Sequence, residues 1–185
     1  MAQRRNPLPV IPIVAVISRH AVARQWGIKQ LCERFPKIAF CSDPQPFEAS
    51  GYYSQAMGEN LEKQFVGFDQ PADPGELADW KVWTNSLEAH YAAGHEHPET
   101  RPLNLDCGYI TEAKLVLATT KDRDHRIYLT EGIYAEVTLS YTGRRWTHHR
   151  WSYPDYRTPL AIEFAEQCRL LLRQHIAQRR LADEL

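Results

Sequence analysis

Acidic and basic side chains cluster between residues 106 and 126, around Asp106, Lys121 and Arg126. The Arg126 guanidinium is a planar donor group that suits a carboxylate or a phosphate, and Lys121 adds a compact positive charge. Asp106 and Glu136 could accept a proton or hold a cation, and His125 could act as an acid. Residues of these types suit a phosphorylated or carboxylated small molecule, and Mg²⁺ is the metal ion that such a site could use.

Two sets of candidate residues follow from this composition. The candidates for catalysis are Asp106, His125 and Glu136. The candidates for ligand binding are Lys114, Lys121, Arg126, Tyr128, Tyr134 and Asp155. The alternative is a solvated ion-pair face on an ordinary sheet, where one cross-strand pair contributes about 0.2–1 kcal/mol.

A hairpin is expected to position several of these side chains. The segments "HRIYL" and "IYAEVTLSY" alternate as strands do, and residues 130–132 form a three-residue loop that ends in glycine. If Leu129 faces Ile133, the pairs that share one side of the hairpin are Tyr128 with Tyr134 and Arg126 with Glu136. His125 then falls on the other side, toward the core. The residues expected to face outward on the second strand are Tyr134, Glu136, Thr138 and Ser140.

Hydrophobic patterns predict the elements around this hairpin. Strands are expected at residues 10–17, 37–41 and 63–68, and in "AKLVLATT", "HRIYL" and "IYAEVTLSY". Helices are expected at about residues 20–35, from the N-cap Asp73 and from Thr158. This order predicts an α+β fold with a single antiparallel sheet and helices mainly on one face. Its ferredoxin-like core is extended by a C-terminal hairpin and helix.

Four further motifs could be structural or functional. The stretch "NLDCGY" predicts a tight turn that enters the sheet, with Gly108 in a left-handed conformation. The aromatic residues of "WSYPDYRTP" are expected to pack the last helix onto the sheet. The histidines of "HEH" at 95–97 and "HH" at 148–149 lack the spacing of a zinc signature, so we predict no metal ligands there. The stretch "RRWTHHRW" could stack and neutralise single-stranded RNA.

Composition excludes several classes of protein. A net charge of -1 gives no general attraction to nucleic acid or anionic membranes. The longest apolar run, "VIPIVAVI", is too short for a membrane span, and no signal peptide precedes it, so we expect a cytoplasmic protein without a membrane partner. No phosphate-binding loop of the GxxxxGK[ST] type occurs. The 185 residues are expected to form one domain over 1–185.

The motifs together resemble a known family. "NLDCGY", "TTKDRDHRIYL", "GIYAEVTLSY" and "WSYPDY", with "YYSQAMG" and "KVWTN" upstream, resemble the bacterial family called domain of unknown function four-four-one-six. The chain differs from that family's usual motifs at Cys107 and Ser152, where proline and threonine are usual. Members are sometimes labelled GTP-binding, but no phosphate-cradling loop is present here. The candidate site residues that the resemblance implies are Asp106, Lys121, His125, Arg126, Tyr128, Glu136 and Asp155.

Three functions stay open at this point. The first is an enzyme or binding protein for a phosphorylated or carboxylated small molecule. The second is a non-catalytic protein-interaction module or homo-oligomer that uses tyrosines near the presumed site, because aromatic residues make up 11% of the chain. The third is RNA binding through residues 144–151.

Overall fold

The most continuous apolar run of the sequence forms the centre of a nine-stranded sheet in the computed structural model, which describes residues 6–48 and 55–183. The strands are β1 (Ile11–Ser18), β2 (Ile38–Cys41), β3 (Gln45–Phe47), β4 (Leu61–Phe68), β5 (Asn104–Ile110), β6 (Lys114–Thr119), β7 (Ile127–Thr130), β8 (Ile133–Thr142) and β9 (Arg145–His148). The α-helices are α1 (Ala21–Arg34), α3 (Leu77–Gly94) and α4 (Pro159–Asp183), and the short 3₁₀ helices are η1 (Pro74–Glu76) and η2 (Pro154–Arg157).

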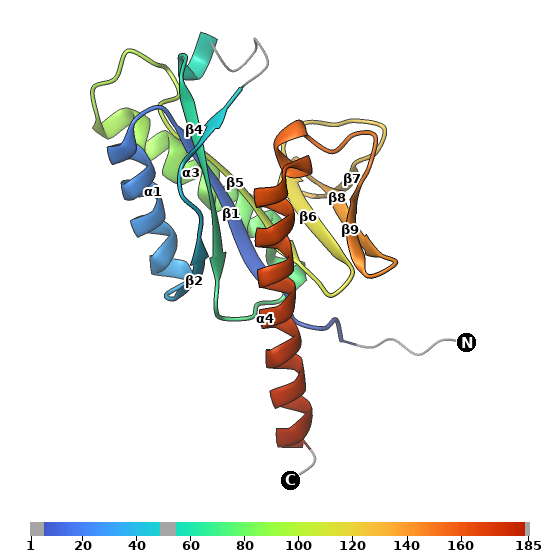
Figure 1. Ribbon diagram of the computed structural model, residues 1–185. Helices are drawn as coiled ribbons and strands as arrows, with labels where there is room; N and C mark the ends of the chain where they lie inside the picture. The colour runs from blue at the N-terminus through green and yellow to red at the C-terminus, as the bar shows by residue number, and fades with distance from the viewer. Residues whose placement is uncertain (1–5, 49–54, 184–185) are drawn as a thin grey trace.

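The strand order confirms the predicted antiparallel α+β fold. The sheet runs β2-β4-β1-β5-β6-β8-β7, β3 also pairs with β4, and β9 also pairs with β8. Every strand pairing is antiparallel. The order β2-β4-β1-β5, with α1 and α3 as connections, is that of a ferredoxin-like core. Strands β6 to β9 extend this core on the β5 side, as Figure 1 shows.

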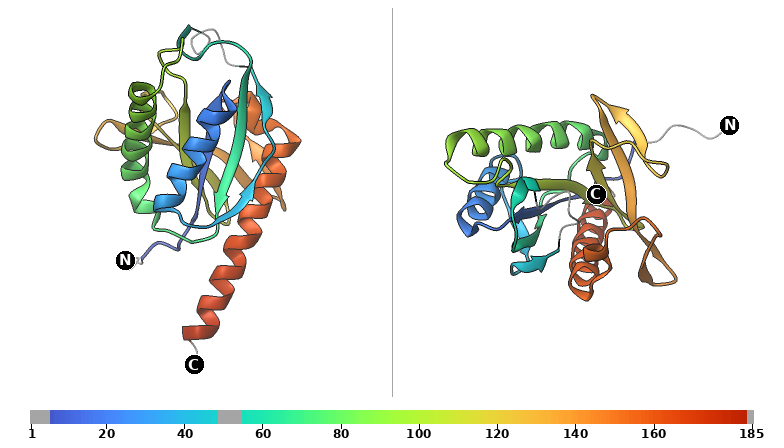
Figure 2. Two further views of the ribbon diagram at one scale, coloured as in Figure 1. Left: turned by 90° about the vertical axis from the view of Figure 1, so that its left-hand side faces the viewer. Right: turned by 90° about the horizontal axis from the view of Figure 1, so that it is seen from above.

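Helices lie on both faces of the sheet (Figure 2). On one face, α1 and α3 pack against β1 through a cluster that includes Val14, Val16 and Trp80. On the opposite face, α4 packs through a second cluster that includes Ile13 and Phe164. Because both faces are covered, every residue of β1 is buried, which is why its sequence is apolar throughout rather than alternating.

Two of the predicted helix starts are explained by their first residues. The Asp73 side chain accepts a hydrogen bond of 2.8 Å from the Gly75 backbone N–H, and η1 leads directly into α3. Pro159 is the first residue of α4, and Thr158 accepts a hydrogen bond from the Ala161 N–H.

The prediction that "NLDCGY" is a turn is wrong. These residues belong to β5, which lies between β1 and β6. Gly108 is extended rather than left-handed, and a Cβ atom there would lie 2.2 Å from the Val116 backbone oxygen. Glycine at this position therefore allows β5 and β6 to approach closely. The polar residues Asn104 and Asp106 are tolerated in a central strand because other side chains bind them.

The hairpin register is confirmed in part. Tyr128 pairs with Tyr134 as predicted, but Thr130 rather than Leu129 lies opposite Ile133. The loop is two residues long, and both of its φ angles are positive, at 51° for Glu131 and 74° for Gly132. This is the conformation of a type I′ turn, whose twist matches that of the two strands.

The prediction of an outward-facing polar row on β8 is also wrong. Glu136 and Thr138 are buried, at 2% and 0% exposed. The pairing of β6 with β8 shifts register between Leu115 and Val116, and this irregularity changes which face the later residues of β8 occupy. His125 and Arg126, from the loop before β7, and Thr138 supply partners for the buried carboxylate of Glu136, and residues of η2 line the pocket beside it.

Candidate functional site

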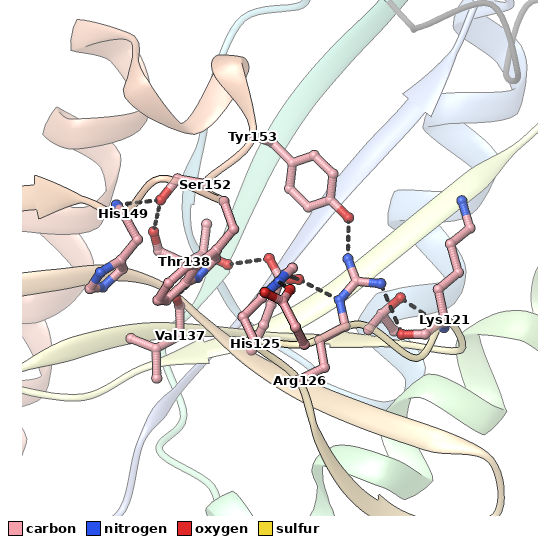
Figure 3. Close-up of polar contacts among 12 residues, drawn as sticks. Lys121, His125, Arg126, Val137, Thr138, His149, Ser152 and Tyr153 are labelled. Carbon is pink, nitrogen blue, oxygen red and sulfur yellow. Dashed lines mark hydrogen bonds and ion pairs between the residues drawn. The ribbon is translucent and has the colours of Figure 1, made fainter.

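Arg126 and Glu136 meet on one side of the β7–β8 hairpin, as the predicted register requires. Arg126 Nε donates a hydrogen bond of 2.7 Å to Glu136 Oε2, and the two side chains are only 5% and 1% exposed. The other two guanidinium nitrogens donate to the Lys121 backbone oxygen at 2.9 Å and to the Tyr153 hydroxyl at 2.7 Å (Figure 3). Arg126 therefore holds three parts of the chain in place and is not the exposed surface ion pair that was the alternative.

A pocket opens beside this pair. It lies next to the sheet where η2 precedes α4, and its cavity volume is about 70 Å³. That volume is enough for a phosphoryl or carboxylate group, since one water molecule needs about 10–15 Å³ on the same measure. The pocket is lined by Ile17, Phe47, Lys63, Asp106, Leu117, Ala118, Thr119, Lys121, Glu136, Tyr153, Asp155 and Tyr156.

Lys63 is the buried cation of this pocket. Its Nζ atom forms an ion pair with Asp155, from η2. Three aromatic rings surround the same ammonium group, with centroids 4.2 Å away for Tyr156, 4.9 Å for Phe65 and 5.3 Å for Phe47. Cation–π attraction of this kind is stronger when the cation is removed from water. Lys63 is therefore fixed in position at the pocket wall.

Asp106 keeps its negative charge although it lies among buried groups. Burial opposes its ionisation, but the charges of Lys81 and Lys63 and a 2.9 Å hydrogen bond from Asn104 together lower its pKa below the ordinary value. Lys81 comes from α3, and its Nζ atom lies 3.6 Å from Asp106 Oδ1. Asp106 is thus a fixed carboxylate that can accept a hydrogen bond, and it is poorly suited to donate a proton near neutral pH.

Tyr156 presents a hydroxyl group to the same pocket. Its side chain is 2% exposed, and its oxygen has no hydrogen-bond partner within the part of the chain that the structure describes. Burial, and then the negative charges of Asp155 and Asp106, raise the pKa of Tyr156 well above 10.0. The hydroxyl therefore stays protonated and can donate a hydrogen bond to a ligand.

Lys121 also lines the pocket, near several cations. Burial lowers its pKa, and the positive charges of Arg101, Arg126 and Arg123 lower it further, while Asp106 acts in the opposite direction. Several positive charges therefore lie close to Lys121. An anion bound there would reduce the repulsion between these cations.

His125 reaches Glu136 despite the expectation that it would turn to the core. Its Nε2 atom lies 3.3 Å from Glu136 Oε2, and its Nδ1 atom lies 3.0 Å from Asp124 Oδ1. The ring stacks on Trp151 at 5.1 Å, and Trp151 stacks in turn on His149 at 4.8 Å. His125 is not among the residues that line the pocket, so it acts on the site through Glu136.

The structure separates the predicted residues into two groups. Asp106, Lys121, Glu136 and Asp155 line the pocket, and Arg126 and His125 bind Glu136 directly behind it. Lys114 lies at the opposite end of β6 from Thr119, where it pairs with Ser140. Tyr128 and Tyr134 form an edge-to-face pair at 5.4 Å on the hairpin, and neither lines the pocket.

The pocket residues that were not predicted as ligand groups include Lys63, Tyr153 and Tyr156. The sequence could have indicated that Lys63 is buried, because alternation along β4 places it on the same side of the strand as the core residues Leu61 and Phe65. Tyr153 and Tyr156 were assigned to packing because they lie beside Pro154 at the start of the last helix.

The pocket carboxylates each have a cationic neighbour. Asp155 pairs with Lys63, Glu136 with Arg126, and Asp106 with Lys81. Within residues 6–48 and 55–183, these carboxylates do not form a group of three close enough to share one metal ion. The geometry thus favours direct contact between a ligand anion and protein donors, and Mg²⁺ stays a prediction.

The tryptophans of the predicted RNA-binding stretch are engaged by the protein. Trp146 is 8% exposed, and its Nε1 atom donates to Glu166 Oε2 at 2.9 Å. Trp151 Nε1 donates to the Val137 backbone oxygen at 2.9 Å, and its ring stacks with those of His125 and His149. These rings therefore do not form an open platform on which bases could stack.

Comparison with known proteins gives one match. The model of the family described as domain of unknown function (DUF4416) matches residues 9–171. No curated protein and no solved structure matches the chain. Among the helices of the described residues, none has the length and apolar composition needed to cross a membrane.

Proposed function

Because the chain belongs to the family of domain of unknown function DUF4416, we propose its function from the pocket itself: it binds the anionic group of a small phosphorylated or carboxylated molecule. The observation that carries this proposal is the convergence of three donors on one cavity. Lys63, Lys121 and the Tyr156 hydroxyl line the same space, and each comes from a different part of the fold.

Several cations favour an anion near Lys121. Burial lowers the pKa of Lys121, and the charges of Arg101, Arg126 and Arg123 lower it further, although Asp106 acts in the opposite direction. Lys63 and the Tyr156 hydroxyl line the same pocket. A ligand anion would therefore contact Lys121 and accept a hydrogen bond from Tyr156.

The pocket also limits the size and character of the ligand. A cavity of about 70 Å³ accommodates the anionic group rather than a whole nucleotide. Ile17, Phe47 and Leu117 give the lining an apolar part, which suits a short carbon skeleton attached to the anion. Small phosphate esters and short carboxylic acids fit this description.

We also propose that the protein acts chemically on the ligand through Glu136. Glu136 lines the pocket and also contacts His125 at 3.3 Å, so it could accept a proton from a bound molecule and share it with the imidazole. Arg126 would position Glu136, because it donates to the same carboxylate oxygen.

A thermal-shift screen tests the binding proposal. Phosphate esters and short carboxylic acids are added with and without Mg²⁺, and a true ligand raises the melting temperature in proportion to the logarithm of its concentration. Lys121→Ala should abolish this response. Lys114→Ala is the matched control, because Lys114 lies at the far end of β6 and outside the pocket. Equal responses in wild type, Lys121→Ala and Lys114→Ala would contradict the proposal.

A specific observation favours protein interaction as a second candidate function. Strand β7 pairs only with β8 among the described residues, so it is an edge strand. Its residues Ile127, Tyr128 and Leu129 are 71%, 57% and 40% exposed. An apolar edge of this kind can add a strand from a partner or from a second copy of the chain. Sedimentation of wild type and Ile127→Lys would show whether the wild-type protein associates through this edge.

A further inference from the structure

Two histidines and a glutamate meet outside the proposed anion pocket. His20 lies immediately before α1, and His97 and Glu99 lie in the segment that joins α3 to β5. One potential ligand atom from each of the three lies within 4.8 Å of the others, and no other such group occurs among the described residues. His20 and Glu99 are 79 residues apart in the sequence, so only the fold brings them together.

We propose, in contrast to the sequence-based prediction of no metal ligands at residues 95–97, that His20, His97 and Glu99 bind a divalent transition-metal ion, with Zn²⁺ as the best match. Two imidazoles and one carboxylate are a donor set that zinc accepts readily, and three protein ligands leave a coordination position for water or another molecule. Hard ions such as Mg²⁺ and Ca²⁺ prefer oxygen ligands, so a set with two nitrogens selects against them.

The distances require only small adjustments of the side chains. Two ligands of a tetrahedral Zn²⁺ ion, each at about 2.1 Å from the metal, lie about 3.4 Å from one another. His20 Nε2 is already 2.9 Å from Glu99 Oε2, and the rings of His20 and His97 are 4.6 Å apart. All three ligand atoms lie within 4.8 Å of one another, so no pair has to approach by more than about 1.4 Å to reach this spacing.

Tyr91 provides an outer contact of the type that orients a metal-binding histidine. Its hydroxyl oxygen lies 3.2 Å from His97 Nε2, and its ring stacks on that of His97 with centroids 5.4 Å apart. When Nε2 carries the proton and donates it to Tyr91, the lone pair of His97 Nδ1 is left for the ion. A surface cavity lined by His20, His97, Tyr91 and Arg19 gives the ion access from solvent.

An ion pair without metal explains part of this arrangement. Arg19 Nη1 lies 3.2 Å from Glu99 Oε1 and competes with a metal for that carboxylate. The pair accounts for His20 and Glu99, but it gives no reason for His97 to lie against them. Arg19 is 38% exposed and can turn to solvent when an ion binds.

The test measures Zn²⁺ binding to the full chain by isothermal titration calorimetry. We expect one equivalent to bind, and we expect His20→Gln, His97→Gln and Glu99→Gln each to weaken binding at least tenfold. His95→Gln is the matched control: His95 belongs to the same "HEH" motif, but its Nδ1 contacts the Tyr91 backbone oxygen and it is not in the group. His95→Gln should bind Zn²⁺ within about twofold of wild type. Arg19→Ala should bind as tightly as wild type or more tightly.

Two results would overturn the proposal. One is that the three ligand variants bind Zn²⁺ as well as His95→Gln does, because the ion is then held by other groups. The other is a zinc anomalous-difference map of the loaded wild-type protein with no peak between His20, His97 and Glu99. This second measurement does not depend on the variants, so it decides the question even where a variant fails to fold. None of the three residues lines the anion pocket, so the outcome is independent of the proposed function.

Discussion

Lys63 and Asp155 form an ion pair between strand β4 and the 3₁₀ helix η2, 92 residues apart in sequence. The lysine side chain is 5% exposed, whereas the aspartate is 21% exposed. This contact joins the ferredoxin-like core to the segment that begins the C-terminal helix. It also fixes one wall of the proposed anion pocket, so we expect stability and ligand binding to depend on the same two residues.

Replacing Lys63 with methionine should destabilise the protein. Lys63→Met leaves Asp155 without its cation in a partly buried position, and loss of one partner of a buried pair costs about 3–5 kcal/mol when both groups are fully buried. Because Asp155 keeps some contact with water, we expect a decrease of about 2–3 kcal/mol in the free energy of unfolding, measured by urea denaturation.

Lys37→Met is the control for this effect. Lys37 also pairs with an aspartate, Asp69, at 2.6 Å, but the lysine side chain is 73% exposed. A surface pair contributes at most about 1 kcal/mol. Equal losses in the two variants would show that the burial of Lys63 is not what makes its pair important.

Arg126→Met should destabilise the protein, because the buried Glu136 carboxylate loses its cationic partner. The Glu136 side chain is 1% exposed, and without the guanidinium its carboxylate retains His125 and Thr138 as neighbours. We expect a loss of about 3 kcal/mol, and we expect Arg126→Met combined with Glu136→Gln to lose less than the sum of the two single variants. A double-mutant cycle in urea measures this coupling.

Arg150→Met provides the comparison for Arg126. Arg150 donates to Asp124 at 2.8 Å, and both side chains are more than 70% exposed, at 77% and 71%. Its replacement should change stability by less than about 0.5 kcal/mol.

Strict additivity of the Arg126 and Glu136 variants would argue against a direct interaction between them.

The pairing of Arg126 with Glu136 was predictable because the two residues are close together in the sequence. Arg126 and Glu136 are 10 residues apart across one turn, so strand alternation and a glycine-containing loop were sufficient to pair them. The bulge at Leu129 and the two-residue turn shifted the pairing by one residue near the loop, but did not separate the ion pair.

The distant part of the site was not predictable in the same way. Lys63 meets Asp155 because β4 and η2 pack together, and no periodic pattern links positions 92 residues apart. Strand β5 was missed because Asn104, Asp106 and Gly108 have the composition of a turn. Their partners, among them Lys81 on α3, come from elements that only the assembled fold places nearby.

The same argument covers the fold as a whole. The ferredoxin-like order was predictable although β5 was missed, because β1, β2, β4 and the two core helices have their own hydrophobic patterns and Asp73 caps the segment that leads into α3. Glu136 is buried because the pocket-lining residues around η2 and the side chains of His125 and Arg126 cover it, and the register shift between Leu115 and Val116 affects only the residues of β8 that follow it. Sequence alternation alone cannot reveal such a shift.

Acid should weaken the protein partly through Asp106. Its pKa is lower in the folded state than the ordinary value of 3.8, so the folded state binds the proton less readily than the unfolded state. Its stabilising contribution is therefore complete above about pH 4 and is lost as the pH falls through the folded-state pKa. Asp106→Asn should lower the melting temperature at pH 7 and reduce the further decrease below pH 4.

Melting curves of wild type and Asp106→Asn between pH 2 and pH 7 check this prediction. Asp79→Asn is a suitable control, because Asp79 lies in the first turn of α3 on its exposed side. If the melting temperature falls equally steeply below pH 4 in wild type and in Asp106→Asn, other carboxylates account for acid unfolding.

Gly108→Ala should be one of the most destabilising single-methyl changes in the protein. The new Cβ atom would lie 2.2 Å from the Val116 backbone oxygen and 2.8 Å from Leu117 Cδ2, so β5 and β6 would have to move apart. Overpacking of a rigid core costs about 1–3 kcal/mol, and here the obstacle is backbone, so we expect the upper part of that range. Because β5 carries Asp106 and β6 leads to Lys121, ligand-induced thermal shifts should decrease as well.

Gly94→Ala is the matched substitution with the opposite expectation. Gly94 is the last residue of α3, and a Cβ atom there meets nothing within 4 Å among the described residues. Alanine favours the helix over glycine by up to about 1 kcal/mol, so Gly94→Ala should leave stability unchanged or raise it. Urea denaturation of both variants measures the difference. A Gly108→Ala protein as stable as Gly94→Ala would show that β5 and β6 are not held as close together as the structure has them.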